Sequence, residues 1–195
     1  MQILYVHGKD GSAGESEHYK PLFPNDEVIG LDYHTFSPWE TGLEILAAVD
    51  ELARKHEDIC LIANSIGAFF SMNAEIDGLI QKAYFISPIV DMEKLIMDMM
   101  KWANVTEAEL EAQGIIHTEF GEDLSWEYLS YVKRQPIKCI QMPKVREVRA
   151  NIETHPAFGE ALEEAKAAGV KTILIGCTVG PGCLTIDESR ISVDL

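Results

Sequence analysis

Basic residues are scarce in this chain of 195 residues, in which 16 Lys and Arg face 32 Asp and Glu and the net charge is −16. Such an excess of acid repels phosphate backbones, so nucleic acid is not expected as a general partner. Long apolar runs are missing too. None approaches the roughly 20 residues that cross a bilayer, so no membrane contact is predicted. The start, MQILYVHG, lacks the basic region of a signal peptide, which favours a cytoplasmic location.

Cysteines are few, and Cys60, Cys139, Cys177 and Cys183 form no C-x-x-C pair. Without paired spacings, a zinc site is not predicted and the thiols are expected to be reduced. The glycine-rich stretch Gly8–Gly14 contains no G-K-[ST] segment, so it is not a phosphate-binding P-loop. We therefore expect neither a bound metal nor a cofactor.

Strands and helices alternate in the first part of the chain. This order predicts an α/β fold with three α/β/α layers and a mostly parallel sheet. Short apolar segments predict strands at Ile3–Val6, Val28–Leu31, Asp58–Ala63 and Ala83–Ile86, and helices are predicted at Thr41–His56 and Ile66–Ala74.

From Met92 to Arg134 the pattern is wholly helical. Met92–Trp102 is apolar and rich in Met, Thr106 and Glu109 have the spacing of a capping box, and Ser125 is a plausible helix cap. A helical insertion after a strand commonly forms a lid over a site, so a lid is predicted over about 92–134. The alternative is that its Met and aromatic residues are simply core.

The composition changes after about residue 135. Residues 1–135 hold 24 acidic and 9 basic residues, whereas residues 136–195 hold 8 and 7. This shift predicts a boundary between a core at 1–135 and an α/β tail at 136–195. In the tail we predict strands at Ile137–Met142, Val170–Gly176, Leu184–Ile186 and Ile191–Val193, and a helix at Pro156–Ala168.

Ser65 carries the strongest chemical signal. It stands between an apolar strand and a helix of small residues, with Ala63 and Gly67 two positions to either side. This arrangement fits the nucleophile elbow G-x-S-x-G, with Ala63 in place of the first glycine, because bulk at either position would collide with the neighbouring helix and strand. The alternative is a strand-turn-helix in which Ser65 merely caps the helix.

Residues 1–135 resemble small bacterial serine hydrolases of the α/β-hydrolase family, close to the YdeN-like type. The resemblance implies Ser65 as the nucleophile and an oxyanion hole built by the backbone at Gly8, Lys9 and Ile66, with His7 structural. It implies a small ester or acyl substrate, as for a carboxylesterase. The segments that carry it are ILYVHGKDGSAGESEHY, VIGLDY, FSPWETG, LIANSIGAFFSMNA, AYFISPIVDMEKLI and GEDLSWEYLSYV.

The family's acid and base segments are missing. After the lid, the resemblance implies a G-x-x-D-like segment and later a G-x-H segment, and residues 137–195 contain neither. In this sense the hydrolase fold is predicted to be truncated. Asp91, which follows the fourth predicted strand, is the candidate acid in its place, and Asp32 is an alternative.

The identity of the catalytic base is also left open by the sequence. A serine hydroxyl is a weak nucleophile near neutral pH without an adjacent base. His117 in the predicted lid and His155 in the tail are candidates, and His18 lies near the oxyanion loop; each could instead be a surface residue. Without a base, we expect only residual activity.

Residues 139–195 are similar to the C-terminal end of the sugar fermentation stimulation protein family. In that family this end follows a nuclease-like core, which is absent here. The chain is thus predicted to be a hybrid joined near Arg134–Lys138, with a natural fusion, a gene-assembly error and a designed chimera as the three alternatives. The match runs through Gln141-Met142, Asn151, Thr154–Phe158, Ala165, Ala168-Gly169-Val170 and Cys177-Thr178-Val179.

Three functions follow from these features. The first is a serine hydrolase acting on a small ester or acyl compound, with weak activity. The second is a non-catalytic relic of a hydrolase that binds a ligand or partner. The third, a nucleic-acid-associated protein acting through the tail, conflicts with the net charge of −16.

Overall fold

A computed structural model describes residues 1–89, 91–134, 145–149 and 172–176. It divides the chain into two compact units, one formed by Met1–Ile89 with Cys139–Leu195 and the other by Val90–Lys138. Each unit is described by itself below.

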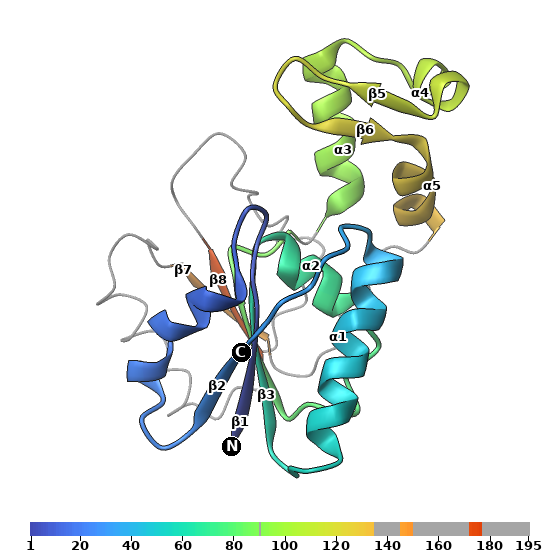
Figure 1. Ribbon diagram of the computed structural model, residues 1–195. Helices are drawn as coiled ribbons and strands as arrows, with labels where there is room; N and C mark the ends of the chain where they lie inside the picture. The colour runs from blue at the N-terminus through green and yellow to red at the C-terminus, as the bar shows by residue number, and fades with distance from the viewer. Residues whose placement is uncertain (90, 135–144, 150–171, 177–195) are drawn as a thin grey trace. The chain divides into compact units, whose positions relative to one another are not determined.

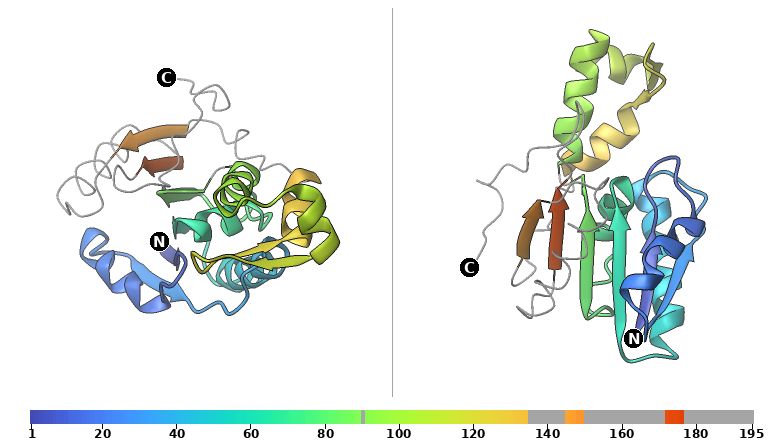
Figure 2. Two further views of the ribbon diagram at one scale, coloured as in Figure 1. Left: turned by 90° about the horizontal axis from the view of Figure 1, so that it is seen from above. Right: turned by 90° about the vertical axis from the view of Figure 1, so that its left-hand side faces the viewer.

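The first unit is built on one parallel sheet of six strands in the order β2-β1-β3-β4-β8-β7 (Figures 1 and 2). The four strands predicted in the first part of the chain are confirmed, with ends shifted by one residue. The strands are β1 (Gln2–Val6), β2 (Glu27–Leu31), β3 (Ile59–Asn64), β4 (Lys82–Ile86), β7 (Val145–Arg149) and β8 (Thr172–Gly176).

Both faces of this sheet are covered, and β1 is buried along its whole length. Helices α1 (Pro38–Ala53) and α2 (Ile66–Met72) pack on one face, and the 3-10 turns η1 (Ala13–His18) and η2 (Lys20–Leu22) on the other (Figure 1). Burial on two faces explains why β1, β3 and β4 are nearly continuous apolar runs rather than alternating patterns.

Helix α1 begins three residues before the predicted start at Thr41. Ser37 caps it by accepting a hydrogen bond from the Glu40 N–H at 3.2 Å, and Pro38 occupies the first helical turn. Proline suits that position because its missing N–H would have no partner within the helix. The glycine-rich stretch Gly8–Gly14 leads into the 3-10 turn η1, which begins at Ala13.

The tail contributes strands to the same sheet. Strand β8 pairs with β4 in parallel, with Ala83 opposite Thr172. The predicted strand Val170–Gly176 is therefore confirmed over its described part, Thr172–Gly176. Strand β7, at the edge, was not predicted. The other predicted tail elements, Ile137–Met142, Pro156–Ala168, Leu184–Ile186 and Ile191–Val193, lie outside the described residues.

The second unit contains α3 (Met92–Ala103), α4 (Glu107–Gln113), the antiparallel pair β5 (Ile115–His117) and β6 (Asp123–Ser125), and α5 (Trp126–Arg134). The prediction of a wholly helical segment is therefore wrong between residues 115 and 125. Gly114 ends α4 at a φ of 76° and Gly121 turns the hairpin at a φ of 84°. Such angles suit glycine, which has no Cβ to clash.

The predicted helix starts in this unit are confirmed. Thr106 and Glu109 form a reciprocal capping box, and the Ser125 hydroxyl accepts from the Tyr128 N–H at 3.2 Å. Met92 and Met100 are buried, as the core alternative predicted, whereas Trp102 is 62% exposed. In the described part of the chain, no helix has both the length and the apolar character needed to cross a membrane.

Candidate functional site

The direction of the chain reverses at β1. From β1 it moves outward to β2, then crosses back through α1 to β3 on the other side of β1. In open parallel sheets, the crevice beyond the carboxyl ends of the strands at such a reversal is the usual place for a ligand. His7 and Gly8 follow β1 at this edge, and Ser65 follows β3. The topology therefore brings together the two segments that the sequence singled out.

Ser65 has a strained backbone, with a φ of 51° and a ψ of −119°. It stands at the cap position of α2, yet its side chain makes no capping hydrogen bond, so the helix-cap alternative does not hold. No described residue hydrogen-bonds to its hydroxyl. A strained serine with a free hydroxyl at a sharp strand-to-helix turn is the geometry of a nucleophile elbow.

Small residues make this turn possible. A Cβ built on Gly67 would lie 2.2 Å from the His7 carbonyl oxygen, and one on Gly8 would lie 3.2 Å from the Ser65 Cβ. Ala63 is fully buried in β3. The expectation that bulk near Ser65 would collide with its surroundings is thus correct, and the clash at Gly67 is with the backbone after β1.

The Gly8 carbonyl is turned toward its own loop. It accepts the Gly11 N–H at 3.2 Å and the His7 Nδ1 at 2.8 Å. Because a trans peptide is planar, the N–H of Lys9 points away from these donors. The N–H of Ile66 is the first in α2 and has no acceptor among the described residues.

His7 is held as part of the scaffold. Its ring is 4% exposed and stacks on Tyr33 with 4.1 Å between ring centroids. Its Nδ1 must be the donor toward Gly8, because a carbonyl only accepts. The Tyr33 hydroxyl donates to the His7 carbonyl at 3.0 Å, and burial raises the pKa of Tyr33 to about 12. Both residues therefore shape the loop.

A polar network around Tyr5, in β1, is not indicated by any sequence pattern. The Tyr5 hydroxyl donates to the Glu15 carboxylate, and the rings of Tyr5 and Tyr19 lie 5.0 Å apart. Burial, followed by the bond to Glu15, raises the pKa of Tyr5 far above its usual value, so the phenol stays protonated. Tyr5 stands in an apolar strand, where an aromatic residue predicts core, so no sequence signal marked it.

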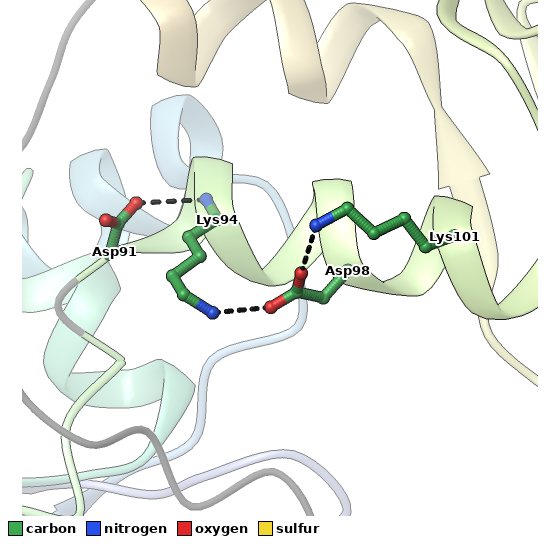
Figure 3. A network of polar contacts seen from close by, with 4 residues as sticks. All are labelled: Asp91, Lys94, Asp98 and Lys101. Atoms are coloured by element: carbon green, nitrogen blue, oxygen red, sulfur yellow. Dashed lines mark hydrogen bonds and ion pairs between the residues drawn. The ribbon is translucent and has the colours of Figure 1, made fainter.

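Asp91, the candidate acid, caps α3 in the second unit. Its Oδ1 accepts the Lys94 N–H at 2.9 Å (Figure 3). Further along the helix, Lys94 and then Lys101 bond to Asp98 and lower the pKa of its carboxyl. This bond gives Asp91 a structural role in its own unit. Its role as catalytic acid stays a prediction, as does that of Asp32, which is exposed and 3.9 Å from His34.

His117, a candidate base, has a carboxylate partner. Its Nδ1 lies 2.7 Å from Asp123 Oδ1 across the β5–β6 pair, where the two residues are directly opposite. Both side chains are exposed. No sequence pattern marks Asp123 as a partner of His117, because only the hairpin brings the two side chains together. His18 is exposed, and His155 lies outside the described residues.

Acidic residues are numerous, yet they do not assemble into a metal site within the described ranges. No group of three His, Cys, Asp or Glu side chains there is arranged to hold an ion.

The chain has the α/β-hydrolase fold, as comparison with solved structures shows. Esterase B from Lactobacillus rhamnosis is 14% identical, with a TM-score of 0.51, 89% of this chain covered and 65% of that chain. The lipase BlEst2 from Bacillus licheniformis is 13% identical, with a TM-score of 0.51, and the match covers 87% of this chain and 74% of that chain. A lipase-esterase related protein from Clostridium acetobutylicum is 13% identical, with a TM-score of 0.51, and the match covers 97% of this chain and 90% of that chain. The chain thus spans slightly less than two thirds of the esterase.

The tail has a separate relationship. Residues 133–182 match the family model described as the sugar fermentation stimulation protein RE domain. This match confirms the resemblance stated for the tail, and it begins close to the junction predicted near Arg134–Lys138. No curated protein matches the chain significantly.

Proposed function

We propose that this protein is a serine hydrolase of the α/β-hydrolase type that acts on a small ester or acyl compound, with Ser65 as its nucleophile. The observation that carries the proposal is the strained backbone of Ser65, at a φ of 51°, together with a hydroxyl that no described residue binds. Strain of this kind persists in proteins mainly where function requires it. A serine that served only the helix would use its hydroxyl as a cap.

In the proposed reaction, the Ser65 oxygen attacks the carbonyl carbon of the substrate and its proton passes to a base. The carbonyl oxygen then carries negative charge. The N–H groups of Lys9 and Ile66 would donate to that oxygen, and the ends of the peptide dipoles at the start of α2 favour the same charge. Loss of the leaving group yields an acyl-enzyme, which water hydrolyses.

The base limits the expected rate. The His7 Nδ1 is bound to the Gly8 carbonyl, and His18, His34 and His56 are exposed in the first unit. We therefore expect slow turnover. Removal of members of the triad in serine hydrolases costs on the order of 10⁴- to 10⁶-fold in rate.

Binding without catalysis is the second candidate function. Among the described residues, no histidine hydrogen-bonds to the Ser65 hydroxyl, which favours a relic that binds a ligand or partner. The two candidates differ in one property, because only a hydrolase needs an activated serine.

A fluorophosphonate probe tests the proposal, because it reacts covalently with activated serines. We expect slow labelling of the wild-type protein that is lost in Ser65→Ala and retained in Ser12→Ala, a control at an exposed loop serine. Labelling that survives Ser65→Ala would remove Ser65 from its role. A wild-type protein that is never labelled would favour the binding function.

The candidate acid and base are tested with the same probe. His117→Gln and Asp91→Asn should each slow the labelling of Ser65 if these residues activate it. Asp91→Asn keeps an oxygen that can cap α3, so the helix should remain folded. Labelling rates equal to wild type in either variant would exclude that residue.

A further inference from the structure

Ser87 is the first residue after β4, and two features set it apart. Its φ is 45°, in the left-handed region that favours glycine. Its Oγ is buried and has no hydrogen-bond partner among the described residues. Buried hydroxyls are nearly always hydrogen-bonded, so an orphan of this kind needs a physical explanation.

The turn that contains Ser87 holds Ser65 from both sides. The Ser65 N–H donates to the Ile86 carbonyl at 2.8 Å, and the Ser65 carbonyl accepts the Ile89 N–H at 3.3 Å. Ile86 directly precedes Ser87, and Ile89 lies two positions after it. The backbone conformation of Ser87 therefore decides where both partners of Ser65 lie.

Glycine would serve the fold better at this position. It adopts a φ of 45° without a steric penalty and has no hydroxyl to bury. Ser87 combines two unfavourable features and lies between Ile86 and Ile89, which hydrogen-bond to the backbone of Ser65. This combination indicates that the position serves the site rather than stability.

We propose that Ser87 is a positioning residue for the Ser65 nucleophile. Its left-handed backbone directs the Ile86 carbonyl and the Ile89 N–H at Ser65. Its buried hydroxyl, which has no partner among the described residues, is available to form a hydrogen bond at this turn while Ser65 reacts. The inference rests on the proposed function, because it needs a reactive Ser65.

Two variants separate the hydroxyl from the backbone. Ser87→Ala removes the hydroxyl and keeps the Cβ, whereas Ser87→Gly removes both. We expect each to slow fluorophosphonate labelling of Ser65 by about tenfold, the effect of losing one hydrogen bond that forms only while Ser65 reacts. The thermal unfolding midpoint should nevertheless rise in Ser87→Gly and not fall in Ser87→Ala. A purely structural role would not give slower labelling in a more stable protein.

Glu75→Gly is the matched control. Glu75 also has a positive φ, of 54°, but it is exposed and has no backbone hydrogen bond to Ser65. Its variant should have a higher midpoint and unchanged labelling. Wild-type labelling rates in both Ser87 variants, or a lower midpoint in both, would overturn the inference and leave the proposed function intact. A wild-type protein that is never labelled would refute both.

Discussion

The carbonyl oxygen of His7 lies where a side chain on Gly67 would begin. A Cβ at position 67 would lie 2.2 Å from that oxygen and 2.9 Å from the carbonyl oxygen of Val6. The start of α2 therefore packs backbone against backbone on the end of β1. This contact places the turn at Ser65 beside the loop that begins with Gly8.

Gly67→Ala should disrupt this contact. The added methyl group must displace backbone atoms, so we expect the free energy of unfolding to fall by about 1–3 kcal/mol. Labelling of Ser65 should fall with it. Urea unfolding measures the first effect and the fluorophosphonate probe the second.

Gly78→Ala provides the control for that change. A Cβ on Gly78 would have no atom within 4 Å. Its stability should therefore change by less than about 1 kcal/mol. Equal losses of stability in the two variants would contradict the proposed close contact at Gly67.

Ser65→Gly should give a more stable protein that the probe does not label. Glycine tolerates a φ of 51° that strains serine, and relief of such strain is worth about 1–3 kcal/mol. Ser65→Ala loses the hydroxyl as well but keeps the strain, so its stability should match that of the wild type. The thermal unfolding midpoints of the wild type, Ser65→Gly and Ser65→Ala measure these differences in stability. If Ser65→Gly unfolds at a lower temperature, the hydroxyl contributes to the fold after all.

Tyr33→Phe should loosen the loop after β1. The change removes the hydroxyl that donates to the His7 carbonyl at 3.0 Å and leaves a buried acceptor without this partner. We expect a loss of about 1–3 kcal/mol in the free energy of unfolding at pH 7.

The pH dependence of this loss has a defined sign. Because burial raises the pKa of Tyr33 from 10.0 to about 12, the folded state favours the protonated phenol. Its contribution is complete below pH 10 and declines as the pH rises toward 12. The stability gap between wild type and Tyr33→Phe should narrow over that window. A gap that stays constant to pH 12 would argue against the raised pKa.

Glu109 should stabilise the start of α4 in a pH-dependent way. The Thr106 hydroxyl and then the Thr106 N–H hydrogen-bond to its carboxylate and lower its pKa below 4.5. A depressed pKa means that the stabilisation is present above pH 4.5 and disappears as the pH falls through the folded-state pKa. Unfolding of wild type and Glu109→Ala should therefore differ at pH 7 and converge in acid. Glu111→Ala, at an exposed position of the same helix, is the control.

Local patterns predicted much of the first unit. Apolar runs marked β1, β2, β3 and β4, because a strand covered on both faces is apolar throughout. The sharp turn at Ser65 was also visible in the sequence, since the small residues Ala63 and Gly67 flank Ser65 at fixed spacing. Strand β7 was missed because VREVR has charged residues at most of its positions, and it belongs to the sheet only through its pairing with β8.

Two pairs of residues, one in each unit, could not be predicted in the same way. His117 and Asp123 are six residues apart, yet only the β5–β6 hairpin places them opposite each other. The Tyr33 hydroxyl donates to the His7 carbonyl, although the two residues are 26 positions apart in the sequence. Such contacts depend on register and on the crossing of strands, which short-range patterns do not contain.

The sequence by itself determined the order of the strands and α-helices over residues 1–89, the small residues around Ser65 and the two different relationships of its parts, because these depend on neighbouring residues. Only the tertiary structure decided that the hydroxyl of Ser65 is not used as a cap, that β8 lies beside β4, and that the turn at Ser87 holds the elbow. Strain, burial and hydrogen bonding arise when distant segments meet, and they are therefore absent from the chain until it folds.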